Sequence, residues 1–318
     1  MSVEAEYAYH DLKPDESAMA DEVLAGLRSD PKYISPKYFY DAKGSALFEQ
    51  ITELPEYYLT RTEMLLFDAH LADIAKLLPA ELCVVEYGSG SSLKIRKLME
   101  TLTPSAYVPV DISAEHLEDN ARTLHGDFPQ IAVYPVCADF TQPVALPDAV
   151  ADLTTLAFFP GSSIGNIEPR DAQRFLANVR RTVGQHGALL IGVDRKKSVP
   201  VLEQAYDDAA GVTAQFNLNV LSHFNEVLQA DFDLGAFDHV ARYNEQAGCI
   251  QMFLRSSRDQ RVRVAGETIA LTAQEEVHTE NSFKYHPEEF LELAAAVGFA
   301  ETARFSDERD WFSLYLLG

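Results

Sequence analysis

Basic residues are scarce in this 318-residue chain, in which 26 lysines and arginines stand against 49 aspartates and glutamates. The resulting formal net charge of −23 gives a surface that repels phosphate backbones and anionic lipid headgroups. The composition therefore argues against nucleic-acid and membrane-surface partners. A hydrophobic content of 47% is otherwise ordinary for a globular protein, and the length allows one large core or two smaller ones.

Cysteines and long apolar runs are also few. Cys83, Cys137 and Cys249 lie far apart without metal-ligand spacing, so we expect neither a metal site nor a disulfide framework. No apolar run approaches the roughly 20 residues that a membrane-spanning helix needs. Residues 1–10 are polar and acidic, unlike a signal peptide. We therefore expect a cytoplasmic protein.

A glycine turn is present, but it lacks the third glycine of the dinucleotide-binding motif. The apolar run from Leu82 to Val85 predicts a fully buried parallel strand. Gly88 and Gly90 interrupt it, and Leu93 occupies the third-glycine position of G-x-G-x-x-G. A bulky side chain fits poorly where a pyrophosphate approaches the helix start. The turn therefore argues against a nicotinamide dinucleotide.

Two acidic residues next to this turn indicate a different cofactor. Glu86 directly precedes the glycines and suits a cationic ligand, such as an ammonium or sulfonium group. A second short strand, 107–111, ends in Asp111, whose carboxylate can accept both hydroxyls of a ribose. Alone, Asp111 can equally cap the next helix, and the glycines can simply shape a turn. Together and in this order, the residues favour S-adenosylmethionine.

Strands alternating with helices predict a doubly wound, Rossmann-like α/β fold with a parallel sheet. The expected strands cover 82–85, 107–111, 131–136, 153–159 and 188–193, with helices at 63–78, 114–124 and 286–296 and one ending near 181. Two closing strands at 302–305 and 311–317 are typical of the methyltransferase variant of this fold. Residues 1–14 are expected to be a tail.

The pattern changes after Asp194. A helix at 213–228 and β segments at 237–243, 250–255, 261–264 and 277–282 predict an inserted α+β unit. We therefore expect a cofactor-binding core of 61–199 plus 286–318, and a substrate-binding domain of 1–60 plus 200–285.

Further candidate site residues lie in loops. Asp139 and Phe140 follow the 131–136 strand, where a carboxylate and a ring can sit beside a purine. Asn166 follows the 153–159 strand and either binds a zwitterion or caps the next helix. In the aromatic stretch 37–62, Tyr40 and Tyr57 are predicted loop tyrosines that can pack on the core or offer hydroxyls to a polar substrate.

Five blocks in order carry a resemblance to a known family. They are FYDAKGSALFEQITELPEYY (39–58), EYGSGSSLK (86–94), YVPVDIS (107–113), FFPGSSIGN (158–166) and HTENSFKY (278–285). Over nearly its whole length the chain resembles the histidine-specific Nα-methyltransferases of ergothioneine biosynthesis. Tyr87, Asn281 and Phe283 depart from the family pattern.

The resemblance implies three methyl transfers from S-adenosylmethionine to the α-amine of L-histidine, which give N,N,N-trimethylhistidine (hercynine) and S-adenosylhomocysteine without a metal. It implies cofactor contacts by Gly88, Lys94, Asp111, Asp139 and Phe140. It implies substrate contacts by Tyr57, Asn166, Tyr206, Met252, Glu280 and Ser282, with Tyr40, Asn166 and Tyr206 as the catalytic positions. We expect a monomer.

Two other functions compete with this interpretation. A related branch methylates indole amino acids, but an unpaired buried carboxylate at Glu280 would be costly beside an indole. A non-catalytic cofactor-binding protein would be expected to lose the substrate residues, yet they are present. We expect positioning groups rather than a dedicated general base, because the methyl donor is already activated and the enzyme mainly aligns and excludes water.

Overall fold

The computed structural model describes residues 6–11, 18–89 and 92–318, so Gly90 and Ser91 of the predicted glycine turn lie outside the described residues. The chain divides into two compact units. Unit 1 comprises the described residues within 1–14, 61–196 and 285–318, and unit 2 those within 15–60 and 197–284. That unit 1 binds the cofactor and unit 2 the substrate stays a prediction.

Unit 1 is built on a nine-stranded sheet in the order β1-β5-β3-β2-β6-β7-β14-β13, with β4 beside β3. The strands are β1 (His10–Asp11), β2 (Leu82–Tyr87), β3 (Ala106–Asp111), β4 (Ala132–Val133), β5 (Val136–Cys137), β6 (Thr154–Phe159), β7 (Ala188–Asp194), β13 (Glu301–Ser306) and β14 (Phe312–Leu317). The strands from β1 to β7 pair in parallel, whereas β14 runs antiparallel to both β7 and β13. This confirms the predicted doubly wound fold and its closing pair.

The order of strands reverses at β2, the strand that ends in the glycine turn. The next strand along the chain, β3, pairs on one side of β2, and β6 pairs on the other. Such a switch point opens a crevice outside the carboxyl ends of the strands, where ligands of open α/β sheets bind. All six residues of β2 are buried, because helices cover both faces of a parallel sheet.

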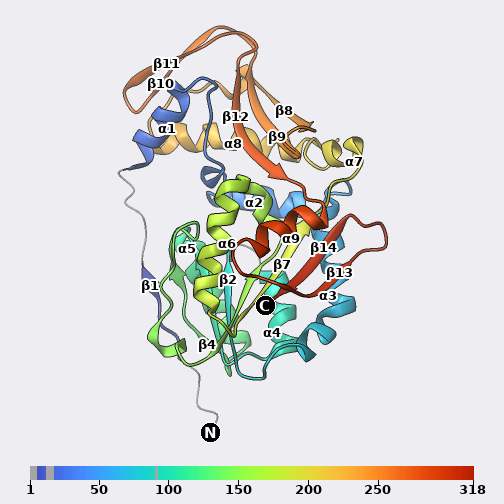
Figure 1. Cartoon of the computed structure of the whole chain (residues 1–318). Helices are drawn as coiled ribbons and strands as arrows, with labels where there is room; N and C mark the ends of the chain where they lie inside the picture. The colour runs from blue at the N-terminus through green and yellow to red at the C-terminus, as the bar shows by residue number, and fades with distance from the viewer. Residues whose placement is uncertain (1–5, 12–17, 90–91) are drawn as a thin grey trace. The chain divides into compact units, whose positions relative to one another are not determined.

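The helices of unit 1 lie around this sheet (Figure 1). They are α4 (Ser92–Leu102), α5 (Ala114–Asp127), α6 (Pro169–Val183) and α9 (Pro287–Ala295), with short 3₁₀ turns η2 (Asp148–Val150) and η3 (Ser163–Asn166). Helix α3 (Tyr58–Lys76) starts in unit 2 and continues into unit 1. In the described ranges, no helix is both long and apolar enough to cross a membrane.

Two details of unit 1 differ from the sequence prediction. Part of the expected tail forms the edge strand β1, which pairs in parallel with β5, and residues 6–11 belong to unit 1. The expected strand 131–136 is split into β4 and β5 at Tyr134 and Pro135. Proline lacks the N–H that a ladder requires, and Pro135 contributes only its carbonyl, which accepts the His10 N–H.

Unit 2 combines helices with a three-stranded antiparallel sheet in the order β12-β9-β8. Its helices are α1 (Ala18–Arg28), η1 (Pro36–Phe39), α2 (Ala42–Glu53), α7 (Val199–Gln204), α8 (Val212–Val227) and η4 (Leu234–Ala236). Its strands are β8 (Phe237–Asn244), β9 (Cys249–Ser256) and β12 (Glu276–Phe283), plus the hairpin β10 (Gln260–Val264) and β11 (Glu267–Leu271) seen in Figure 1. The second hairpin strand was not predicted, and α3 begins at Tyr58, ahead of the predicted helix start at 63.

Candidate functional site

Four predicted cofactor residues meet at the carboxyl ends of β2, β3 and β5. Gly88 has φ +76°, and its N–H donates to the Val110 carbonyl at 2.8 Å. A Cβ at Gly88 would lie 3.7 Å from the Phe140 ring, so this ring faces the turn. Asp111 ends β3, and Asp139 follows β5, the strand paired with β3. Residues far apart in sequence thus share one edge of the sheet.

Local hydrogen bonds orient the two carboxylates at this edge. Asp111 accepts the Ser113 N–H at 2.9 Å, in the turn that leads into α5. Asp139 accepts both the N–H and the hydroxyl of Thr141, at 2.9 and 2.6 Å. The N-cap of α5 is Ser113, so the alternative that Asp111 caps this helix is wrong, and the bond to the Ser113 N–H instead fixes the direction in which the Asp111 carboxylate points.

Glu86 is a buried acid at the end of β2. The Tyr107 hydroxyl donates to its carboxylate, and burial raises the pKa of Glu86 to about 8. Burial raises a carboxyl pKa because the charged form loses hydration. A cation placed nearby would favour the ionised form, and the pairing of Glu86 with a cationic ligand stays a prediction.

A cluster of four aromatic side chains includes Phe140 and lies next to these strand ends. Tyr87, Phe140, Phe159 and Phe175 lie with ring centroids 4.7 to 6.5 Å apart. Tyr87, which departs from the family pattern, is buried in this group, and burial raises its pKa to about 12. The tyrosine at position 87 thus adds a ring to neighbours that are already aromatic. Phe140 is the half-buried member of this cluster.

Glu63 on α3 is a site residue that the sequence did not reveal. It is fully buried, and the Lys94 ammonium lies 2.6 Å from its carboxylate. Both carboxylate oxygens also accept the N–H of Gly161, at 3.0 and 2.9 Å. Glu63 thus joins the predicted cofactor residue Lys94 to the loop that follows β6. In sequence it is one acidic residue in the first turns of an amphipathic helix, a position usually exposed.

Asn166 lies at the end of η3 in unit 1 and is half-buried. The residue that caps α6 is Glu168, so the predicted alternative that Asn166 caps this helix is wrong. Ser162, which directly precedes η3, connects the loop after β6 to the end of β7. Its backbone is left-handed (φ 57°), and its hydroxyl accepts the Asp194 N–H at 2.8 Å. This leaves the Asn166 side chain to a role other than capping.

In unit 2, two predicted substrate residues share a hydrogen-bonded triangle with a lysine. The Tyr206 hydroxyl lies 2.7 Å from the Ser282 hydroxyl, and the Lys284 ammonium donates to each of them at 2.8 Å. All three side chains are buried. Sequence reasoning found Tyr206 and Ser282 but assigned nothing to Lys284.

Tyr40 and Tyr57 reach this triangle through a row of rings. Tyr57 lies 6.1 Å from the Tyr206 ring and 6.3 Å from Phe48, centroid to centroid. Tyr40 packs edge-on against Phe48 at 5.8 Å and is the most exposed ring of the row. The structure therefore brings Tyr57 beside Tyr206, and Tyr40 lies two rings further along the row, beyond Phe48.

Glu280 faces the buried side of the sheet because of a bulge in β12. The register shifts between His278 and Glu280, which places Glu280 opposite Met252 of β9. Strict alternation from Glu276 would turn Glu280 and Ser282 to the other face, since one extra residue exchanges the faces of a strand. Bulges next to functional sites commonly redirect a side chain in this way.

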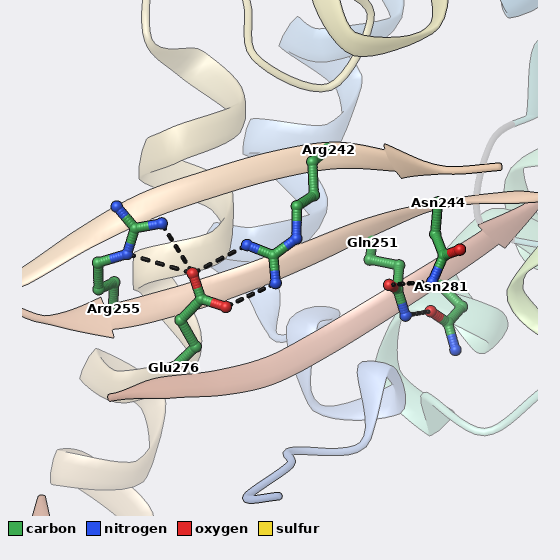
Figure 2. Close-up of polar contacts among 6 residues, drawn as sticks. All are labelled: Arg242, Asn244, Gln251, Arg255, Glu276 and Asn281. Carbon is green, nitrogen blue, oxygen red and sulfur yellow. Dashed lines mark hydrogen bonds and ion pairs between the residues drawn. The ribbon is translucent and has the colours of Figure 1, made fainter. Parts of the chain in front are cut away.

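The opposite face of this sheet is polar and internally paired, as Figure 2 shows. Glu276 binds both Arg242 and Arg255 there, and these bonds lower its pKa to about 2. Asn281 accepts a hydrogen bond from Gln251 on the same face at 3.0 Å. Asn281, which departs from the family pattern, therefore belongs to the face away from Glu280.

Glu280 itself is 5% exposed, and burial raises its pKa to about 7. Its carboxylate has no hydrogen-bond partner among the described residues. A buried carboxylate without a donor is costly, because its lost hydration is not replaced. A donor supplied by a ligand would replace this lost hydration.

His239 holds the backbone of Tyr206. Its Nε2 lies 2.9 Å from the Tyr206 carbonyl, and its Nδ1 lies 2.8 Å from the Asn217 amide nitrogen. With the amide as donor, Nδ1 accepts and Nε2–H donates, which defines a neutral imidazole. Burial lowers the pKa of His239, in keeping with this neutral form. This positioning residue was also missed.

Stability of the ligand-free protein is expected to fall as pH rises through the raised pKa values of Glu280 and Glu86. Folding raises the pKa of each carboxyl above its ordinary value of 4.5, so the stability that each contributes is complete below pH 4.5. This contribution is lost as the pH rises through the folded pKa, which is about 7 for Glu280 and about 8 for Glu86. Thermal unfolding of the wild type and Glu280→Gln from pH 5 to 9 measures this. The wild type should lose more stability near pH 7 than the variant, because glutamine at position 280 cannot ionise. Parallel stability curves would contradict the raised pKa of Glu280.

The residues of unit 1 fit S-adenosylmethionine. Gly88 has a positive φ and lies beside the Phe140 ring, which a Cβ at this position would approach to 3.7 Å. The Asp111 carboxylate suits ribose hydroxyls, and the buried Glu86 would be stabilised as an anion by a cation. A doubly wound sheet that closes with an antiparallel pair and carries such residues at its switch point defines the class of S-adenosylmethionine-dependent methyltransferases.

Comparison with known proteins identifies the family. The chain belongs to the histidine-specific, S-adenosylmethionine-dependent methyltransferases, whose family model matches residues 19–318. It is 40% identical to the histidine N-alpha-methyltransferase of Mycolicibacterium smegmatis and 39% identical to that of Mycobacterium tuberculosis, over 94% of each chain. It is also 30% identical to ergothioneine biosynthesis protein 1 of Neurospora crassa, over 91% of this chain and 33% of that protein.

Proposed function

We propose that this enzyme methylates the α-amine of L-histidine three times to give N,N,N-trimethylhistidine, a step of ergothioneine biosynthesis. The observation that carries the proposal is Glu280, a buried carboxylate without a hydrogen-bond donor from the described residues. An imidazole N–H supplies the missing donor, whereas an aliphatic side chain does not. The names of the relatives in Mycolicibacterium, Mycobacterium and Neurospora support the same substrate and pathway.

The substrate roles follow the chemistry of each side chain. Glu280 and Ser282 read the two imidazole nitrogens, and Met252, opposite Glu280, packs against the ring. Tyr57 borders the imidazole beside Tyr206. Tyr206 donates to the substrate carboxylate, and Asn166 has the same proposed role. A site built from hydrogen-bonding groups rejects analogues that lack the partner, because its buried polar groups are then left unpaired.

The cofactor roles fall to Gly88, Lys94, Asp111, Asp139 and Phe140, all in unit 1. S-adenosylmethionine supplies an electrophilic methyl group on a sulfonium sulfur. Asp111 would accept the ribose hydroxyls, and Lys94 would bind the cofactor carboxylate. Phe140, half-buried beside Gly88, would pack against the purine with Asp139 next to it. Glu86 would oppose the positive charge.

Catalysis on this proposal consists of alignment and exclusion of water. The α-amine has to be neutral to attack. On this proposal the site therefore places no carboxylate next to the α-amine, because its negative charge would stabilise the protonated ammonium form. Tyr40 lies at the exposed end of the ring row that includes Tyr57, which suits a place near the α-amine. We assign positioning roles to Tyr40, Tyr206 and Asn166 and no general base.

The position of the methyl groups tests the proposal directly. The enzyme is incubated with S-adenosylmethionine and histidine labelled with ¹⁵N in the ring only, and the product is fragmented in a mass spectrometer. Loss of unlabelled trimethylamine is expected, because all three methyl groups lie on the α-nitrogen. Methyl groups on the labelled ring nitrogens, or a product that stops at one methyl group, would contradict it.

A further inference from the structure

A buried lysine directly follows β12. Lys284 is 1% exposed, and its ammonium lies 2.8 Å from both the Tyr206 and Ser282 hydroxyls. We propose that Lys284 is a positioning residue of the histidine site, which orients these two hydroxyls toward the substrate and supplies the positive charge that offsets Glu280. This inference rests on the function proposed above.

The hydrogen atoms of the triangle determine which way its hydroxyls donate. An ammonium group only donates, so both hydroxyl oxygens accept from Lys284. The 2.7 Å contact between Tyr206 and Ser282 uses the proton of one hydroxyl. The proton of the other is therefore directed outside the triangle. A substrate carboxylate or an unprotonated imidazole nitrogen can only accept, so this arrangement presents the type of group that histidine needs.

Lys284 donates to Ser282, which lies on the same face of β12 as Glu280, so the positive charge of Lys284 acts on Glu280. Burial raises the pKa of Glu280, and the ammonium of Lys284 opposes this shift. On the neighbouring strand β9, the residue opposite Glu280 is the apolar Met252. His239 on β8 is held neutral, with its ring bonded to the Tyr206 carbonyl. Among the described residues, Lys284 is thus the cation that favours the ionised form of Glu280.

This placement separates two effects that substitutions can distinguish. A buried cation needs compensation, and one carboxylate that accepts a substrate N–H also needs to be ionised at the working pH. Lys284 therefore makes two contributions. It orients the Tyr206 and Ser282 hydroxyls by hydrogen bonds, and its charge favours the ionised form of Glu280. Lys284→Met removes both contributions with little change of volume, whereas Lys284→Arg keeps the charge and changes the geometry.

The test is the pH dependence of kcat/KM for histidine. In Lys284→Met we expect the KM for histidine to rise by roughly tenfold or more, and the acid limb of the profile to move to higher pH as Glu280 becomes harder to ionise. The calorimetric affinity for S-adenosylmethionine should not change. Lys284→Arg should raise KM with the acid limb in place. Lys37→Met, which removes an exposed lysine of unit 2 paired with Glu22, should leave KM and the profile unchanged.

Two outcomes overturn the inference while histidine methylation by the wild type stands. One is an unchanged KM in folded Lys284→Met; the other is a raised KM with an unmoved acid limb, which assigns the lysine a purely structural role. If Lys284→Met does not fold, the Lys284 ammonium protons are followed by NMR in the wild type. They should shift on adding histidine, and an absence of shift overturns the inference. A wild type that leaves histidine unmethylated overturns the proposed function itself.

Discussion

Replacing Glu280 with alanine is expected to raise the KM for histidine by roughly 10- to 100-fold, the range for losing a hydrogen bond to a charged group. The carboxylate is buried, lacks a donor among the described residues and faces the same side as Met252 and Ser282. Its removal takes away the acceptor for the imidazole N–H. Steady-state kinetics with varied histidine measures the KM.

The affinity for S-adenosylmethionine provides the internal control, because Glu280 belongs to unit 2 and the proposed cofactor residues to unit 1. It should remain within about twofold by calorimetry, since sites that share no partner contribute independently. Glu276→Ala is the matched variant, because it removes a carboxylate from the same strand but from the opposite, arginine-paired face (Figure 2). A loss of cofactor and histidine binding in equal measure would sink the assigned role.

Replacing Glu63 with alanine is expected to destabilise the enzyme by about 3–5 kcal/mol and to weaken cofactor binding, because it leaves the ammonium of Lys94, whose side chain is only 13% exposed, without its partner. The Gly161 N–H loses its acceptor at the same time. Chemical denaturation gives the stability, and calorimetry gives the affinity for S-adenosylmethionine.

Two further variants separate this role from a general effect on α3. Asp68→Ala removes an exposed acid of the same helix that pairs with Lys97, and it should change neither property appreciably. Gly192→Ala should destabilise by about 1–3 kcal/mol, because its Cβ would lie 2.0 Å from a Glu63 oxygen and 2.9 Å from the Phe312 ring. A Glu63→Ala enzyme as stable as Asp68→Ala would show that the buried ion pair contributes little.

Residues at strand ends could be predicted from the sequence because their position depends on local pattern. An apolar run followed by glycine, and short strands ending in acids, locate Gly88, Asp111 and Asp139 without knowledge of the tertiary contacts. The same reasoning found the doubly wound sheet. The structure adds that these positions lie along adjacent strands, β2, β3 and β5.

The residues that were missed depend on partners distant in sequence. Glu63 is buried by a loop 98 residues away, and Lys284 bonds to a tyrosine 78 residues away. In sequence each is a charged residue beside an amphipathic element, which usually means an exposed face. The bulge before Glu280 is similar, because no residue type in 276–283 marks the register shift that turns this side chain inward. Only the resemblance to a family indicated Glu280.

Mass spectrometry of a competitive reaction tests the central claim most directly. The enzyme is given S-adenosylmethionine and an equimolar mixture of all free amino acids, and every methylated product is identified. Histidine carrying up to three methyl groups, with the other amino acids unmodified, is the predicted result. Methylated tryptophan with unmodified histidine would contradict the role of Glu280 and the histidine site built around it.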